Sequence, residues 1–205
     1  MEFLFLIVIL IFSVVIHEVS HGFVANYLGD STAKQAGRLT LNPIPHLDPI
    51  GSILVPGFLI LMSGFMGGGI IFGWAKPVPV NTYNLRDQKY GSAKVSLAGP
   101  GSNLLLALVF GLALRFLPIF EFNPMLAEAF FSIIFINILL AIFNLIPIPP
   151  LDGSHVLFTF LPASAENIKI FLSRYGIFIL LGIIFLIPGL LSGVVNSIFK
   201  LIVGV

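Results

Sequence analysis

Two histidines and one glutamate stand close together in an otherwise apolar segment. His17, Glu18 and His21 form the pattern H-E-x-x-H. An α-helix turns once every 3.6 residues, so the two imidazoles lie one above the other on one helix face and can bind one Zn²⁺ ion. Glu18 lies beside that face and can take a proton from a zinc-held water without displacing a ligand. Zinc lowers the pKa of such a water to about 7 and polarises a peptide carbonyl.

A structural pair of histidines, or a chance match to the pattern, is the alternative interpretation. The surrounding segment, FLFLIVILIFSVVIHEVSHGFV, is apolar enough to lie in a membrane. Ionisable side chains are costly there and usually serve a function. We therefore favour a catalytic metal site.

A catalytic zinc takes three protein ligands and leaves a fourth position for water. The chain has no cysteine, so the third ligand must be His, Asp or Glu. Asp152 follows a long apolar segment in PIPPLDG. The prolines cannot continue a helix and predict an extended stretch, which a membrane tolerates only when it is buried in protein or lines a wet cavity. The alternative is that Asp152 belongs to an Asp-Gly surface turn. Because His17 and His21 are present in the same chain, we favour Asp152 as the third ligand.

The elements that must position these residues are strongly apolar. Of 205 residues, 58% are hydrophobic and 9% charged, whereas a soluble domain has about 25% charged residues. Lipid is therefore the expected surrounding, and a nucleic-acid partner is excluded because no basic blocks alternate with aromatic residues. Apolar runs that can supply spanning helices of about 20 residues lie at 3–16, 53–72, 104–117, 130–143 and 177–187.

These runs predict an all-α polytopic membrane protein that forms a single domain over residues 1–205. We expect about four full transmembrane helices plus a membrane-associated re-entrant or β-hairpin element; five or six helices are the alternative. The first helix lacks a basic leader and a small-residue cleavage site, so it is retained rather than removed as a signal peptide. The expected helices span about 2–28, 93–117, 126–146 and part of 175–203, where Pro188-Gly189 breaks the last.

Two polar segments marked by prolines connect the apolar runs. Residues 31–50 are β-prone around Leu39–Leu41 and are predicted to form an extended loop or short strands. Residues 74–92 are predicted to form a second loop. His46 and His155 are candidate accessory groups, but we expect them to be ordinary polar-loop histidines because three ligands are already assigned.

Three segments resemble the site-2 protease family of intramembrane zinc metalloproteases. They are HEVSH at 17–21, SLAGPGSN at 96–103 and NLIPIPPLDG at 144–153. The resemblance implies that His17, His21 and Asp152 bind zinc and that Glu18 is the catalytic base. It is closest to the small, minimal-core branch without a PDZ or CBS domain.

The resemblance also assigns weaker roles. It implies that Asn144 faces the active site and hydrogen-bonds the substrate carbonyl or oxyanion. The usual pattern has asparagine directly before proline, and here two residues intervene, a variant that the family also shows. Small residues at 98, 99 and 101 allow close helix packing, and Asn103 can hydrogen-bond across helices. For GWAKPVPVN at 73–81, the family suggests a membrane-associated β element that aligns a substrate strand.

The shared metal constrains the topology. His17 lies towards the C-terminal end of the first helix, at an end of the bundle that we name side B. The helix at 126–146 must then run towards side B to deliver Asp152, and the helix at 93–117 must run back to the opposite end, side A. A single crossing by residues 51–73 would separate the ligands, so we predict a re-entrant hairpin that turns near 63–69.

Basic residues suggest which side of the membrane each end faces. Side A holds Arg115 and Lys200. Under the positive-inside rule, side B is cytoplasmic and the active site lies nearer that face, in what we expect to be the inner membrane of a prokaryotic cell. The basic residues on side B are Lys34, Arg38, Lys76, Arg86, Lys89, Lys94, Lys169 and Arg174.

The sequence therefore predicts an intramembrane zinc metalloprotease. It would hydrolyse peptide bonds in or near transmembrane segments, in regulated intramembrane proteolysis or in the clearance of membrane peptides. Its partners would be a substrate helix or peptide and the lipid bilayer; the sequence sets no oligomeric state. A non-proteolytic membrane metal-binding protein or scaffold is the alternative, because it would share the ligands but need no base. A transporter would show ionisable residues on several helices or matching broken helices, and neither is present.

Overall fold

Four long apolar helices dominate the structure. The computed structural model describes residues 2–54, 75–117, 123–186 and 188–204. Within these residues, four helices have apolar spans of 19 to 26 residues with mean hydropathies of 1.6 to 2.4, which matches the length needed to cross a bilayer. The described ranges contain no strand, so the prediction of an all-α fold with four membrane-length helices is confirmed. The long helices are α1 (Glu2–Tyr27), α4 (Gly91–Phe116), α6 (Pro124–Asn144) and α8 (Glu166–Leu186).

Short helices occupy the connections. Of the prediction of an extended loop or short strands over residues 31–50, the strands are wrong and the loop is correct in part. The segment holds α2 (Thr32–Gln35), η1 (Ile44–His46) and the start of η2 (Pro49–Leu54), and its other residues are turns, bends and irregular backbone. Local hydrogen bonds explain the difference: Asp30 Oδ1 accepts from the Thr32 backbone N–H, and Asn42 Oδ1 accepts from that of Ile44. Such side-chain bonds favour tight turns over a ladder. The short elements are α2 (Thr32–Gln35), η1 (Ile44–His46), η2 (Pro49–Leu54), η3 (Thr82–Asn84), α7 (Asp152–Phe160) and η4 (Ala163–Ala165).

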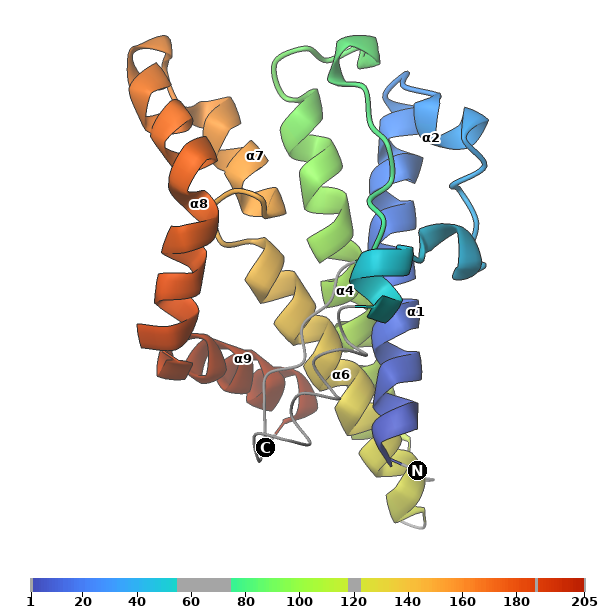
Figure 1. Cartoon of the computed structure of the whole chain (residues 1–205). Coiled ribbons are helices and arrows are strands. Elements are labelled where there is room, and N and C mark those ends of the chain that lie inside the picture. The colour runs from blue at the N-terminus through green and yellow to red at the C-terminus, as the bar shows by residue number, and fades with distance from the viewer. Residues whose placement is uncertain (1, 55–74, 118–122, 187, 205) are drawn as a thin grey trace.

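The helix directions agree with the topology that a shared metal requires. Figure 1 shows α1 and α6 running towards the end of the bundle that carries α7, while α4 runs the opposite way between them. α4 packs against α1, α6 and α7. The C-terminal end of α1 and the start of α7 therefore lie at the same end, which is side B.

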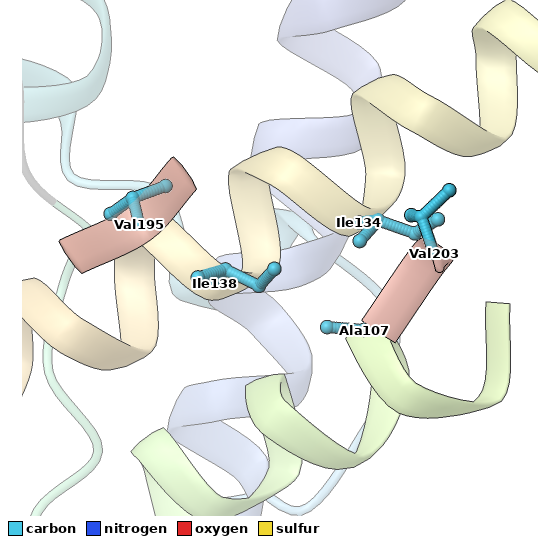
Figure 2. Packing of buried hydrophobic residues seen from close by; sticks show 5 residues of the cluster. All are labelled: Ala107, Ile134, Ile138, Val195 and Val203. Atoms are coloured by element: carbon cyan, nitrogen blue, oxygen red, sulfur yellow. The ribbon is translucent and has the colours of Figure 1, made fainter. Parts of the chain in front are cut away.

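A hydrophobic cluster holds the other end together. α9 (Pro188–Val203) lies across the foot of the bundle in Figure 1. The predicted helix break is confirmed, because α8 ends at Leu186 and α9 starts with Pro188, a residue suited to a first helical position. Figure 2 shows how side chains of α4, α6 and α9 meet. The fully or almost fully buried members of the cluster are Ala107, Ile134, Ile138, Val195 and Val203.

Residues before and after the undescribed segment 55–74 are hydrogen-bonded to each other. The Lys76 N–H donates to the His46 carbonyl over 2.9 Å. The buried guanidinium of Arg38 donates to the carbonyls of Lys76 (2.9 Å) and Pro77 (3.1 Å), and also to that of Pro45. These contacts join the two sides of the segment predicted to be a hairpin. The hairpin itself, including its turn near 63–69, lies outside the described residues.

Residues 75–81 follow without regular secondary structure, and their trace runs alongside α1 in Figure 1. They belong to the segment for which a β element was expected, but in the described part of the chain they pair with no strand. Asp30 fixes their far end, since its Oδ2 accepts from the Asn81 N–H over 2.7 Å. Burial by itself would raise the pKa of Asp30, but hydrogen bonds from Thr32, Asn81 and Asn84 outweigh it and lower the pKa. The segment is thus anchored at both ends as it passes α1.

Candidate metal centre

One helix, α1, and the start of another, α7, bring three ligand atoms together. His17 Nε2 lies 3.1 Å and His21 Nε2 lies 3.2 Å from Asp152 Oδ2. The three ligand atoms lie within 4.8 Å of one another, the one such group among the described residues. Tetrahedral zinc with bonds of about 2.0–2.2 Å places its ligands about 3.3–3.6 Å apart. Two imidazole nitrogens and one carboxylate oxygen at this spacing fit a zinc ion.

Asp152 reaches the histidines because of how α6 ends. The prolines after Asn144 do not give the extended stretch we predicted; residues 145–151 form consecutive turns instead. Hydrogen bonds from Ile148 N to Ile146 O and from Leu151 N to Ile148 O close these turns. α7 then begins at Asp152, where a carboxylate is favourable at a helix N-terminus. We did not predict α7.

The charge of Asp152 also suits a ligand. Burial by itself would raise the pKa of the carboxyl group. The hydrogen bonds and positive charges of the two histidines in their protonated form outweigh that effect and bring the pKa of Asp152 to about 2. Asp152 is therefore an ionised acceptor at neutral pH.

The outer nitrogens of both histidines have hydrogen-bond acceptors. His17 Nδ1 lies 2.6 Å from Asn103 Oδ1, and His21 Nδ1 lies 2.7 Å from the Val95 carbonyl. Each acceptor requires the proton on Nδ1, so each imidazole in its neutral form has its lone pair on Nε2, directed at the site. This is the arrangement of metal-binding histidines, whose other ring nitrogen donates to an oxygen.

Gly99 leaves room for the metal. A Cβ atom built at this position would lie 2.4 Å from His21 Nε2 and 2.5 Å from His17 Nε2. Zn–N bonds measure about 2.0–2.1 Å, so that atom would overlap an ion bound between the two nitrogens. We expected small residues in SLAGPGSN to serve helix packing. Gly99 has a more specific position, on the metal side of the histidines.

Glu18 is held by residues 75–81, through the backbone of Val78. Its Oε2 accepts a hydrogen bond from the Val78 N–H over 2.9 Å. Glu18 lines a cavity of 360 Å³ together with the three candidate ligands. A carboxylate beside the ligands, with one oxygen held by a backbone N–H, can accept a proton from a water in this cavity.

Three other predicted residues occupy different places. Asn144 lines the same cavity, and its Nδ2 donates to the Leu140 carbonyl over 2.9 Å. His155 is exposed and also lines the cavity. His46 lies outside it, almost fully buried, with Nε2 2.9 Å from the Thr40 carbonyl. The site therefore includes Asn144 and His155 at its wall but not His46.

The structure also identifies residues that sequence reasoning missed. Val78 holds Glu18 through a backbone N–H, which no side-chain pattern encodes. Asn137 is buried beside Asn103 and donates to Ser13 Oγ over 2.9 Å. A polar amide in the middle of the apolar α6 was a usable signal, because membrane helices seldom carry one without a role.

Comparison with known proteins gives consistent relatives. Residues 121–183 match the model of "Peptidase family M50". "Putative zinc metalloprotease YwhC" of Bacillus subtilis is 40% identical over 190 residues, which cover 90% of this chain and 81% of that protein. "Putative zinc metalloprotease Rip2" of Mycobacterium tuberculosis is 31% identical over 196 residues, covering 92% of this chain and 70% of that protein. No solved structure matches the chain.

The length and identity of these matches establish the relationship. The match to the Bacillus subtilis protein extends over nine-tenths of this chain at 40% identity. The described structure adds four membrane-length helices and a His-His-Asp cluster that fits an H-E-x-x-H zinc site. The chain therefore belongs to peptidase family M50, the site-2 protease family of zinc metalloproteases.

Proposed function

We propose that this metalloprotease hydrolyses peptide bonds within or next to transmembrane segments of other membrane proteins. The observation that carries the proposal is the position of the candidate ligands in the bundle. His17 and His21 belong to an apolar span, Leu4–Tyr27, and both side chains are buried. A peptide bond must therefore reach the site among membrane-length helices, which favours substrates that already lie in the bilayer.

The chain's own residues would divide the reaction between them. His17, His21 and Asp152 would hold the zinc ion. When bound, zinc lowers the pKa of a water and polarises the carbonyl that the water attacks. Glu18 would take a proton from the attacking water as its oxygen bonds to the carbonyl carbon, and would pass it to the amine nitrogen as the C–N bond breaks. The Val78 N–H would keep one Glu18 oxygen in place while the other accepts the proton.

The test uses the full-length protein in lipid vesicles. A labelled model transmembrane peptide is added, and the products are identified by mass spectrometry. We expect zinc-dependent cleavage in or next to the apolar segment, lost on chelation and restored by zinc. A protein that binds zinc but leaves the peptide intact, or that cuts only soluble unfolded protein, would contradict the proposal.

Asn144 would contribute to the same reaction. It lies on the cavity wall with Asp152, and one of its two amide hydrogens is used by the Leu140 carbonyl. The other can donate to the oxygen on which negative charge develops. Removing one such donor lowers kcat by about 10²-fold or more. We expect this loss in Asn144→Ala with zinc affinity unchanged, measured by initial cleavage rates and zinc titration; equal loss of zinc would instead give Asn144 a structural role.

We further propose that side B faces the cytoplasm of a prokaryotic cell, with the protein in the inner membrane. Basic residues concentrate at that end, as the positive-inside rule requires, and the two relatives described above are bacterial. Tyr83 is 89% exposed at side B and Met125 is 82% exposed at side A. Because the chain has no cysteine, a single Tyr83→Cys should be labelled by an impermeant maleimide only from the cytoplasmic side. Met125→Cys should show the reverse pattern, and labelling of Tyr83→Cys from outside would refute this orientation.

A further inference from the structure

Three polar side chains meet in the interior of the bundle, away from the cavity. Ser13 of α1, Asn103 of α4 and Asn137 of α6 are 3%, 0% and 1% exposed. Two carboxamides buried between membrane-length helices are costly unless their hydrogen bonds are satisfied. Here they are satisfied by one another and by His17.

The hydrogen bonds all donate in one direction, from His17 at the metal site through Asn103 to Asn137 of α6. Asn137 Nδ2 donates to Ser13 Oγ and to the Ile133 carbonyl, each over 2.9 Å. Asn137 Oδ1 is thus left to accept from Asn103 Nδ2 over 2.8 Å.

Asn103 then has one orientation available. Its Nδ2 donates to both Asn137 Oδ1 and the Ser13 carbonyl, the latter over 3.2 Å. With the amide nitrogen committed to acceptors, Asn103 Oδ1 is the atom that faces His17 Nδ1 at 2.6 Å. An oxygen there accepts only if His17 carries its proton on Nδ1.

We propose that Asn103, oriented by Asn137, is a positioning residue that fixes the tautomer and ring orientation of His17. His17 Nε2 then keeps its lone pair for zinc. The two histidines differ in this respect. His21 Nδ1 faces the backbone carbonyl of Val95, which no substitution removes, whereas the orientation of His17 depends on side chains. The inference rests on the proposed zinc site but concerns metal affinity rather than cleavage.

A purely structural role makes different predictions. If the amides only join α1, α4 and α6, their removal lowers stability and leaves the zinc affinity of the folded protein unchanged. If they position His17, zinc affinity falls by about 10- to 100-fold, the range for groups that orient a metal ligand. In that case, replacing Asn137 weakens zinc binding only because it changes the orientation of Asn103.

The experiment measures the zinc dissociation constant of the purified full-length protein by chelator competition, with melting temperature recorded separately. We expect Asn103→Leu to weaken zinc binding about 10- to 100-fold and Asn137→Leu to weaken it less. Asn103→Asp keeps an acceptor for His17 Nδ1, so it should stay within about tenfold of wild type even though it loses two donated bonds and melts earlier. The double Leu variant should bind no more weakly than Asn103→Leu alone, as expected for coupled residues.

Ile138→Ala is the matched control, because Ile138 is adjacent to Asn137, fully buried and part of the apolar cluster. It should lower the melting temperature without changing zinc affinity. Wild-type affinity in folded Asn103→Leu would overturn the inference. If Asn103→Leu does not fold, the zinc affinities of Asn137→Leu and Ile138→Ala are compared instead. Equal zinc affinity in these two variants would overturn the inference. A wild-type protein that binds no zinc would instead refute the proposed site.

Discussion

Replacing Glu18 by glutamine is expected to lower the cleavage rate by about 10²- to 10⁴-fold, the usual contribution of a general base. Glutamine has the same shape as glutamate, and its side-chain oxygen can still accept from the Val78 N–H that holds Oε2 at 2.9 Å. It cannot take a proton from the attacking water. The measurement is the initial rate on the transmembrane peptide in lipid vesicles.

Glu18 supplies none of the three ligand atoms that converge. The Glu18→Gln variant therefore tests catalysis separately from metal binding. The Glu18→Gln protein should hold one zinc per chain with an affinity close to that of wild type and should melt at a similar temperature. Cleavage at the wild-type rate would contradict the role of Glu18 as the base. Loss of zinc from the variant would show that Glu18 takes part in binding the metal.

Gly99→Ala is expected to remove zinc binding. The added methyl carbon would lie 2.4 and 2.5 Å from the Nε2 atoms of His21 and His17, too close for either nitrogen to remain in place. It would also occupy the space of an ion bound about 2.0–2.1 Å from both. Because both ligands are affected, we expect zinc affinity to fall by more than the roughly 100-fold that loss of a supporting group can cause. Zinc content and chelator competition measure the effect, and cleavage should be lost in parallel.

Gly101→Ala is the control for Gly99→Ala. Gly101 lies in the same helix, two positions later, and a Cβ there meets nothing within 4 Å. Alanine stabilises a helix interior by about 0.5–1 kcal/mol relative to glycine, so this variant should bind zinc normally and melt at an equal or slightly higher temperature. If the two variants bind zinc equally well, the space beside Gly99 is not the metal position.

Much of the fold follows from the sequence because lipid imposes a simple rule. A segment of about 20 apolar residues must become a helix, since no water is present to satisfy its backbone. α1, α4 and α6 therefore begin and end within a few residues of the predicted ranges. The convergence of Asp152 with His17 and His21 was also predictable, because H-E-x-x-H supplies two zinc ligands and requires a third.

The remaining features depend on contacts between distant segments. α7 contains only nine residues and includes Gly153, and isolated helices of this length are marginal by themselves; α4 packs against it and supports it. The short helices of residues 31–50 form because side chains bond to nearby backbone groups, which outweighs the β-propensity of that segment. The packing of α4 and of residues 75–81 against α1 places Gly99 and Val78 at the site. No local sequence pattern predicts this packing.

The separation of the ligands along the chain also bears on how the protein is made. His17 and Asp152 are 135 residues apart, and a membrane protein is synthesised from its N-terminus. The nascent chain therefore carries two imidazoles and Glu18 in its first helix through most of translation, without the carboxylate that completes the metal site. A fragment released by a stalled ribosome before α7 would lack Asp152, the third of the candidate ligands. Proteolytic capacity would then arise only once nearly the whole bundle has been inserted.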